Sequence, residues 1–415
     1  MGEYIMIKFA VIGVALITFI YRLVLGIVQY RSANNPTPQS VADVYDTETY
    51  LKWKKYSAEN CVLSLASTAV SFVVTVALLA ADAYSAFASL FPDTVFWGLF
   101  AVILLETIAD TVFSVIKSYI SVMIIEEKYG FNRSSAKTFV FDIIRNTLLS
   151  FALSLGLVCV LWGIHQAFGD LLILLFAAVL FLFTLAVSFL YPVFSRIGNK
   201  FTPLEDGELK DRLMSLLTGH GYKVKAIEVM DASRRTTKLN AYFTGFGKMK
   251  TIVLYDNLVN SMTPDEICAV FAHELGHGLH KDVLKMQIMN LGNLLIMACA
   301  VWFAVREPAL HTAFGFETVN YGFAYILLGV GLGVIQPFTS LIINAYSRKA
   351  EFRADKQSVK EGYGEAMITA LKKLARENFA HLSPSKLNVA LDYSHPPLAQ
   401  RIEAVEEEIT KNPCC

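Results

Sequence analysis

Residues 273–277 read His-Glu-Leu-Gly-His, with the two histidines four positions apart. On an α-helix, residues at this spacing lie one above the other on the same face, so His273 and His277 can present their imidazoles to a single zinc ion. Residues 263–266, Thr-Pro-Asp-Glu, have the form of a helix start, with the threonine as N-cap and the glutamate completing a capping box. The sequence therefore predicts a helix that carries a metal site about two turns after its start.

A zinc site of this kind needs a general base and a third protein ligand. Glu274 lies beside the histidines, where its carboxylate can take a proton from a water molecule whose pKa zinc lowers to roughly 7. Glu351 and Asp355 share a helical face after a long apolar segment. Glu351 would complete the coordination, and Asp355 would orient a ligand histidine through a hydrogen bond. Alone, this second pair would be an ordinary solvated acidic face, but with residues 273–277 it predicts a zinc metalloprotease.

The composition indicates a membrane protein. Of the 415 residues, 54% are hydrophobic and only 17% are charged, which lies outside the range of soluble domains. Lys and Arg together number 36, as do Asp and Glu, so the net charge gives no reason to expect a nucleic-acid partner. The six cysteines lack the spacing of a metal site or a disulfide framework, and we expect Cys268 in the core.

Seven apolar segments are long enough to cross a bilayer. They lie near residues 8–30, 61–81, 95–122, 143–164, 171–193, 283–305 and 322–345. The first is too long and too poorly flanked for a cleavable signal peptide. Basic residues gather in the first and third loops, which predicts that these loops, the large fifth loop and the C-terminus are cytoplasmic and that the N-terminus is outside. This topology brings the two halves of the predicted zinc site to the same membrane face.

Charged side chains occur within the predicted spans. Glu106 and Asp110 lie one turn apart in the third span, which favours a hydrated interior. Arg22 and Lys117 fit either that interior or local pairing and snorkelling near the helix ends.

The segments between the spans give four parts: a membrane region of five helices (1–193), a cytoplasmic protease domain (194–282), spans six and seven (283–346) and the C-terminal part of the protease domain (347–415). In the second part, a capping box at 202–205 predicts a helix to about residue 218. Residues 222–230 read as a strand, and 239–243 with 251–255 as a hairpin. In zincins, an edge strand beside the zinc holds the substrate backbone. The residues that could form this edge, unless the hairpin is purely structural, are Asn240, Ala241, Tyr242 and Phe243.

The chain resembles the type I CAAX prenyl protease family, integral-membrane zinc proteases that include the a-factor-converting and prelamin-processing enzymes. The resemblance runs nearly the full length and rests on residues 50–53, 56–57, 125–132, 200–204, 240–243, 273–277, 347–348, 351–355 and 395–398, with Arg401. It implies a polytopic α-helical fold with seven transmembrane helices forming a barrel around a hydrated chamber, capped by a cytoplasmic zincin-like α+β domain.

The resemblance also implies roles for individual residues. It implies one Zn²⁺ per chain, held by His273, His277 and Glu351, with Glu274 as catalytic acid and base. It puts Asn240 on the substrate-binding strand and His395 near the bound substrate, where its imidazole could stabilise an oxyanion. Arg348 and Arg401 would shape the site. From the residues alone, His395 would be a turn residue before a Pro-Pro step.

The function implied is removal of the last three residues from an isoprenylated CAAX protein or peptide within a lipid bilayer. The membrane would be the endoplasmic reticulum in a eukaryote or the inner membrane in a prokaryote, and the oligomeric state stays open. One alternative is a quality-control protease without a prenyl requirement. Another is a zinc-containing membrane chaperone or scaffold, against which Glu274 argues, because a structural zinc site needs no general base. A transporter that uses Glu106 and Asp110 is a third.

Overall fold

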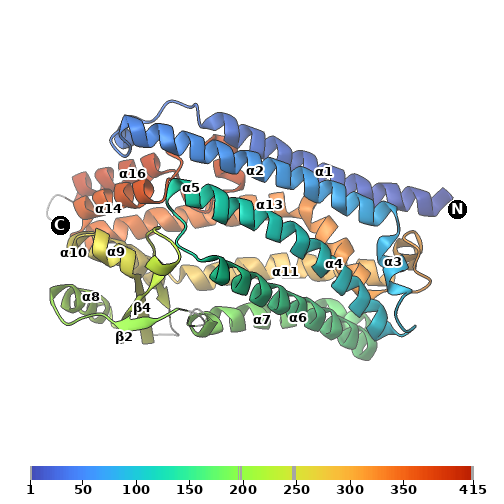
Figure 1. The fold of residues 1–415 in the computed structure, drawn as a ribbon. Helices are drawn as coiled ribbons and strands as arrows, with labels where there is room; N and C mark the ends of the chain where they lie inside the picture. The colour runs from blue at the N-terminus through green and yellow to red at the C-terminus, as the bar shows by residue number, and fades with distance from the viewer. Residues whose placement is uncertain (1, 195, 197–198, 245–248, 413–415) are drawn as a thin grey trace.

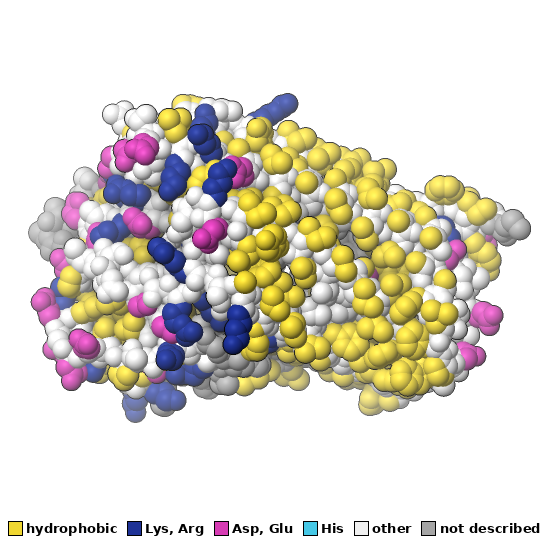
Figure 2. All heavy atoms as spheres, viewed as in Figure 1, with side chains coloured by type: hydrophobic (Ala, Val, Ile, Leu, Met, Phe, Trp, Pro, Cys, Tyr) yellow, Lys and Arg dark blue, Asp and Glu magenta, His cyan; other side chains and the backbone are white. Residues whose placement is uncertain are grey.

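The computed structural model describes residues 2–194, 196, 199–244 and 249–412. Long helices run side by side along the molecule, and the sheet and several shorter helices gather at one end (Figure 1). The first helix begins at the opposite end from this group (Figure 1). Charged side chains cluster at the end that holds the sheet, whereas hydrophobic side chains cover the helical bundle (Figure 2). This distribution matches a helical bundle in a bilayer with a polar domain outside it.

Six helical runs in the described part of the chain are long and apolar enough to cross a membrane. One of them, residues 136–187, contains two helices, because Gly169 adopts a φ of 53° and ends the first helix. Each predicted apolar segment lies on these helices, and the protein is therefore a polytopic helical membrane protein. The long helices are α1 (Gly2–Ser32), α2 (Thr47–Ala80), α4 (Val95–Ser118), α6 (Ala136–Phe168), α7 (Leu172–Phe194), α11 (Asp282–Arg306) and α13 (Tyr321–Lys360).

Local sequence explains where several of these helices begin. The side chains of Asp46, Thr94 and Ser135 accept hydrogen bonds from the first-turn backbone N–H groups of α2, α4 and α6, as N-caps do. A π-helical segment, Tyr119–Glu126, follows α4 and leads into the single turn α5 (Glu127–Tyr129). The remaining short helices are α3 (Ala83–Ala88), α9 (Asp256–Ser261), α12 (Pro308–Thr312) and α15 (Lys386–Leu391).

The membrane helices enclose a cavity of about 1130 Å³. Glu106 and Asp110 line it, in agreement with the hydrated interior predicted from their sequence positions. Arg22 and Lys117 line it as well, and Arg22 also donates a hydrogen bond to Gln336 (3.2 Å). Hydroxyl side chains on one face each of α2 and α4 add to this polar wall: Ser64, Ser67, Thr68, Ser71, Thr75, Thr107, Thr111 and Ser114.

The polar end of the molecule contains a four-stranded sheet in the order β1-β2-β4-β3. The strands are β1 (Phe201–Pro203), β2 (Lys223–Met230), β3 (Ala241–Thr244) and β4 (Met249–Tyr255). The pair β2–β4 is parallel, the other two pairs are antiparallel, and β3 forms an edge. Four further helices at this end pack on the sheet or on one another: α8 (Glu208–Gly219), α10 (Pro264–Leu279), α14 (Gly364–Glu377) and α16 (Leu398–Lys411).

The predicted strand and hairpin are confirmed, although the hairpin turn at 245–248 lies outside the described residues. Cys268 is fully buried, as expected, whereas Cys414 and Cys415 are also outside the described residues. The predicted helix to about residue 218 is present as α8, but the prediction that it starts at the capping box 202–205 was wrong. Thr202 and Pro203 pair with β2 instead, and α8 begins only after Gly207. Leu204 continues this pairing with a backbone hydrogen bond to Ile227 (2.9 Å), so tertiary pairing overrides the local signal.

Helices α10 and α13 cross at very close range. Gly276 of α10 lies against Ala354 of α13, and a Cβ atom on Gly276 would stand 2.8 Å from the Cα of Ala354. Ser358 strengthens the crossing with a buried hydrogen bond to the carbonyl oxygen of Ala269 (2.8 Å). Residue 276 must therefore be glycine for the helices to sit at this distance.

We predict that Gly276→Ala destabilises the protein, because the backbone of Ala354 cannot yield to the added methyl group as a flexible side chain could. Overpacking of this kind costs about 1–3 kcal/mol, more than the roughly 1 kcal/mol that alanine gains over glycine in a helix. The measurement is the Tm in detergent. Gly292→Ala in α11 is the matched control, since nothing lies within 4 Å of its added Cβ. Equal Tm values for both variants would contradict the proposed close packing.

Candidate metal centre

Helix α10 begins as its sequence predicts. The hydroxyl of Thr263 accepts a hydrogen bond from the backbone N–H of Glu266 (3.3 Å), and the Glu266 carboxylate accepts one from the backbone N–H of Thr263 (2.8 Å). Lys373 of α14 also donates to Glu266 (2.9 Å), which ties the helix start to the surrounding domain. This anchored start fixes the position of α10 in the domain and therefore the direction in which its two histidines point.

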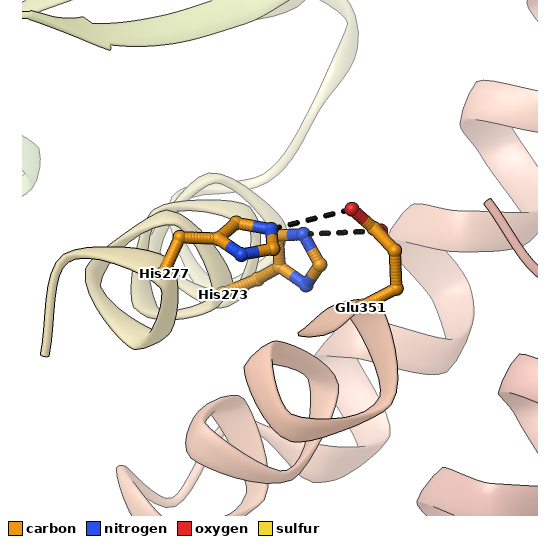
Figure 3. A group of neighbouring side chains, drawn as sticks. All are labelled: His273, His277 and Glu351. Carbon is orange, nitrogen blue, oxygen red and sulfur yellow. Dashed lines mark ion pairs between the residues drawn. The ribbon is translucent and has the colours of Figure 1, made fainter. Parts of the chain in front are cut away.

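The two histidines of α10 and Glu351 of α13 point toward one another (Figure 3). The Nε2 atom of His273 lies 3.6 Å from one Glu351 oxygen, and the Nε2 atom of His277 lies 3.3 Å from the other. One ligand atom from each of the three residues falls within 4.8 Å of the others. Two atoms that each lie about 2.1 Å from one tetrahedral ion would stand about 3.4 Å apart. The spacing therefore suits a divalent metal ion.

The environment of the three side chains also favours a cation. His273 and Glu351 are buried, and the Oε2 atom of Glu351 is buried without a hydrogen-bond partner in the described part of the protein. A buried carboxylate oxygen that accepts no hydrogen bond is costly. Burial lowers the pKa of His277, but the hydrogen bond and negative charge of Glu351 outweigh it and raise that pKa to about 9. The pocket thus attracts positive charge, and nitrogen and carboxylate donors are the ligands that a metal ion such as zinc takes.

Asp355 holds His273 from behind. Its Oδ1 atom lies 2.8 Å from the Nδ1 atom of His273. Arg401 of α16 binds both Asp355 oxygens, through Nε (2.8 Å) and Nη2 (2.6 Å). A third guanidinium nitrogen, Nη1, lies 3.5 Å from Glu351. Arg401 therefore balances the charge of two buried carboxylates and locks the carboxylate that orients His273.

His277 has a corresponding partner that sequence reasoning missed. The Nδ1 atom of His277 lies 3.1 Å from the Oδ2 atom of Asp282, the first residue of α11. The sequence signal was an acidic residue five positions after His277, but such a residue at a helix start is usually explained by the helix dipole alone. Only the turn between α10 and α11 brings this carboxylate back to the imidazole.

His395 reaches the site from the loop before α16. Its Nε2 atom lies 3.3 Å from Glu351, and its side chain is 62% exposed, so it faces the open side of the cluster. Arg348 secures this loop by donating hydrogen bonds to the carbonyl oxygens of Val389 (2.7 Å) and Tyr393 (2.8 Å). Although most of the side chain stays accessible, partial desolvation by the surrounding protein lowers the pKa of His395 and favours a neutral imidazole. The sequence pattern alone gave no reason to place this residue here.

The edge strand β3 lies beside Glu274, since Glu274, Ala241 and Tyr242 line the same small pocket. Asn240, just before the strand, is exposed, and the side chain of Phe243 lies outside the described part of the structure. Asn378 fixes the approach to β3 by exchanging two hydrogen bonds with the backbone of Leu239 (3.0 and 3.2 Å). An edge strand of the sheet is thus held next to the carboxylate of the His-Glu-Leu-Gly-His motif.

Known proteins match the chain over both its membrane and polar parts. The family model for Peptidase family M48 matches residues 203–409, and that for the CAAX prenyl protease N-terminal region, with five membrane helices, matches residues 6–196. The CAAX prenyl protease 1 homolog of Arabidopsis thaliana is 30% identical, over 97% of this chain and 98% of that protein. CAAX prenyl protease 1 of Saccharomyces cerevisiae is 28% identical, over 96% and 95%.

The three-dimensional fold also matches that of a solved protein. The crystal structure of S. mikatae Ste24p superimposes with a TM-score of 0.90 at 28% identity, covering 96% of this chain and 99% of that one. The crossing of α10 and α13 lies inside the matched M48 segment. The agreement over nearly the whole length, in sequence and in three dimensions, shows that this multi-pass membrane protein is a metalloprotease of the CAAX prenyl protease 1 family.

Proposed function

We propose that the protein is a membrane-embedded zinc endopeptidase that removes the C-terminal tripeptide from isoprenylated CAAX proteins or peptides. The observation that carries this proposal is the convergence of His273, His277 and Glu351 on one point, in the same motif as Glu274, which shares a pocket with the edge strand β3. The relatives named as CAAX prenyl proteases support the choice of substrate.

In this proposal, His273, His277 and Glu351 hold the zinc ion, which supplies the Lewis acidity that makes water nucleophilic at neutral pH. Glu274 accepts the proton of the attacking water and passes it to the leaving amine. The backbone of residues 240–243 holds the substrate as an added strand. This arrangement keeps the scissile carbonyl next to Glu274, because Ala241 and Tyr242 share a pocket with that carboxylate.

His395 would stabilise the negative charge that develops on the carbonyl oxygen. The hydroxyl of Ser394 lies 2.8 Å from the Nδ1 atom of His395 and can donate to it, which leaves the proton on Nε2, the nitrogen nearest Glu351. Asp355 and Arg401 keep His273 in place, and Arg348 holds the loop that carries His395. In this proposal, Asp355, Arg401 and Arg348 therefore act by positioning His273 and His395, the side chains at or next to the reacting atoms.

The proposed topology has seven crossings, with the N-terminus outside and the C-terminus in the cytoplasm. A crossing takes about 20 residues, so the 52-residue run 136–187 is long enough for two, and α6 and α7 share one apolar core. The division into a membrane region (1–193), a zincin-like domain (194–282), two further spans (283–346) and the rest of the protease domain (347–415) follows. The membrane is the endoplasmic reticulum in a eukaryote and the inner membrane in a prokaryote.

Two neighbouring cavities, one among the membrane helices and one close to the loop that carries His395, support a lipidated substrate. A second cavity of about 410 Å³ shares Arg22, Ser64 and Thr68 with the large one. It extends to Asp392 and Tyr393, the latter two residues before His395. A peptide could therefore occupy the site while its attached lipid remains at membrane depth.

We predict that Glu274→Gln retains zinc but loses peptidase activity by about 10²- to 10⁴-fold, the usual contribution of a general base. Bound zinc is measured by elemental analysis of the purified protein and activity by peptide cleavage. His277→Ala is the comparison variant and should lose both zinc and activity. Full activity in Glu274→Gln would refute the assignment of the base.

A pair of peptides separates CAAX processing from general membrane proteolysis. We expect the protein to cleave a farnesylated CAAX peptide faster than the same peptide without the farnesyl group, with release of the last three residues detected by mass spectrometry. Chelation of zinc should abolish cleavage, and added zinc should restore it. Equal rates on both peptides would instead support a quality-control protease without a prenyl requirement.

A further inference from the structure

Asp282 occupies a confined position between the two helices that carry the metal cluster. Helix α10 ends at Leu279, and Lys281 adopts a left-handed conformation with a φ of 53°. This turn folds the first residue of α11 back toward α10. Asp282 is only 2% exposed, so its carboxylate is held in the protein rather than in solvent, unlike an ordinary acidic residue at a helix start.

Both oxygens of Asp282 have specific partners. Oδ2 lies 3.1 Å from the Nδ1 atom of His277, whereas Oδ1 accepts hydrogen bonds from the hydroxyl of Tyr346 (2.9 Å) and from Arg353 (2.8 Å). Tyr346 and Arg353 lie on α13, the helix that also carries Glu351. The carboxylate therefore connects the imidazole on α10 to two donors on the opposite helix.

The two histidines have matching supports. His273 faces Asp355, which Arg401 holds, and His277 faces Asp282, which Arg353 holds. The sequence pattern predicts roles for His273, Asp355 and His277, but not for Asp282. A carboxylate at Nδ1 fixes the proton on that nitrogen, leaves the Nε2 lone pair free for a metal and makes the imidazole a stronger ligand.

We propose that Asp282 is the positioning residue of His277: it sets the tautomer and ring orientation with which His277 binds zinc, and it couples that ligand to α13 through Tyr346 and Arg353. This inference rests on the proposed zinc site. Asp282 does not touch the substrate or the attacking water, so its effect on the reaction passes entirely through the metal ligand.

The test is the zinc affinity of Asp282→Asn, measured by competition with a metal-binding dye on the purified full-length protein in detergent. Donors face both oxygens of Asp282, so an amide, which has one acceptor oxygen, must present its NH₂ group to one of them. We expect zinc to bind about 10- to 100-fold more weakly. The kcat for the farnesylated peptide should fall at subsaturating zinc, while KM stays at the wild-type value.

Asp265→Asn is the matched control. Asp265 lies on α10 and, like Asp282, pairs with an arginine, Arg212, but its side chain is 64% exposed and lies far along the helix from His277. It removes the same charge without touching the cluster, and it should keep wild-type zinc affinity. The Tm of each variant in the presence of a chelator reports how much the side chain contributes to stability without zinc. The zinc affinity of the folded protein reports its effect on metal binding separately.

A folded Asp282→Asn protein with wild-type zinc affinity would overturn the inference. If Asp282→Asn does not fold, Arg353→Met decides, because it keeps the contact between Asp282 and His277 but removes one donor that holds the carboxylate. A loss of zinc affinity in Arg353→Met supports the coupling, and an unchanged affinity contradicts it. If the wild-type protein binds zinc but cleaves neither peptide, the proposed function is contradicted. The zinc affinities of the variants still test the role of Asp282 in that case.

Discussion

The close crossing of α10 and α13 is the constraint on which the rest of the molecule depends. One helix carries the two histidines, and the other carries Glu351, 74 residues after His277 in the chain. The absence of a side chain at Gly276 lets the backbones approach, and the buried bond from Ser358 to Ala269 holds them there. Because α13 is continuous from the membrane to the metal centre, the position of Glu351 depends on the membrane bundle as much as on the protease domain.

Bringing these helices together buries several charges, which is costly unless each is paired. The protein meets this cost with carboxylates and arginines placed in alternation around the imidazoles: Asp355 with Arg401, and Asp282 with Arg353. The same pairs restrict the orientation of the two rings. Stability and ligand geometry therefore come from one set of contacts, and a substitution in this network is expected to affect both.

The membrane part follows the same physical rule in a different medium. Charged and hydroxyl side chains at membrane depth are tolerated when they face a polar cavity rather than lipid. Here the large cavity is lined by four charged side chains: Glu106, Asp110, Arg22 and Lys117. Hydroxyl side chains of α2 and α4 line the same cavity. The apolar surface seen in Figure 2 is then free to contact lipid. A chamber of this kind lets a polar peptide and water exist inside a bundle that is apolar outside.

Patterns among near neighbours in the sequence were enough to predict several features: the apolar spans, the capped helix at Thr263, the spacing of His273 and His277, and the alternating strands. Each of these features is encoded by residues that lie close together in the chain, so a short stretch of sequence is enough to recognise it. Family resemblance supplied His395, Arg348 and Arg401, whose isolated positions show no such period. Three-dimensional packing was needed to show that residues 201–203 pair as a strand instead of starting a helix, and that Asp282 turns back to His277. These outcomes depend on which distant segments lie alongside, and that information appears only once the chain has packed.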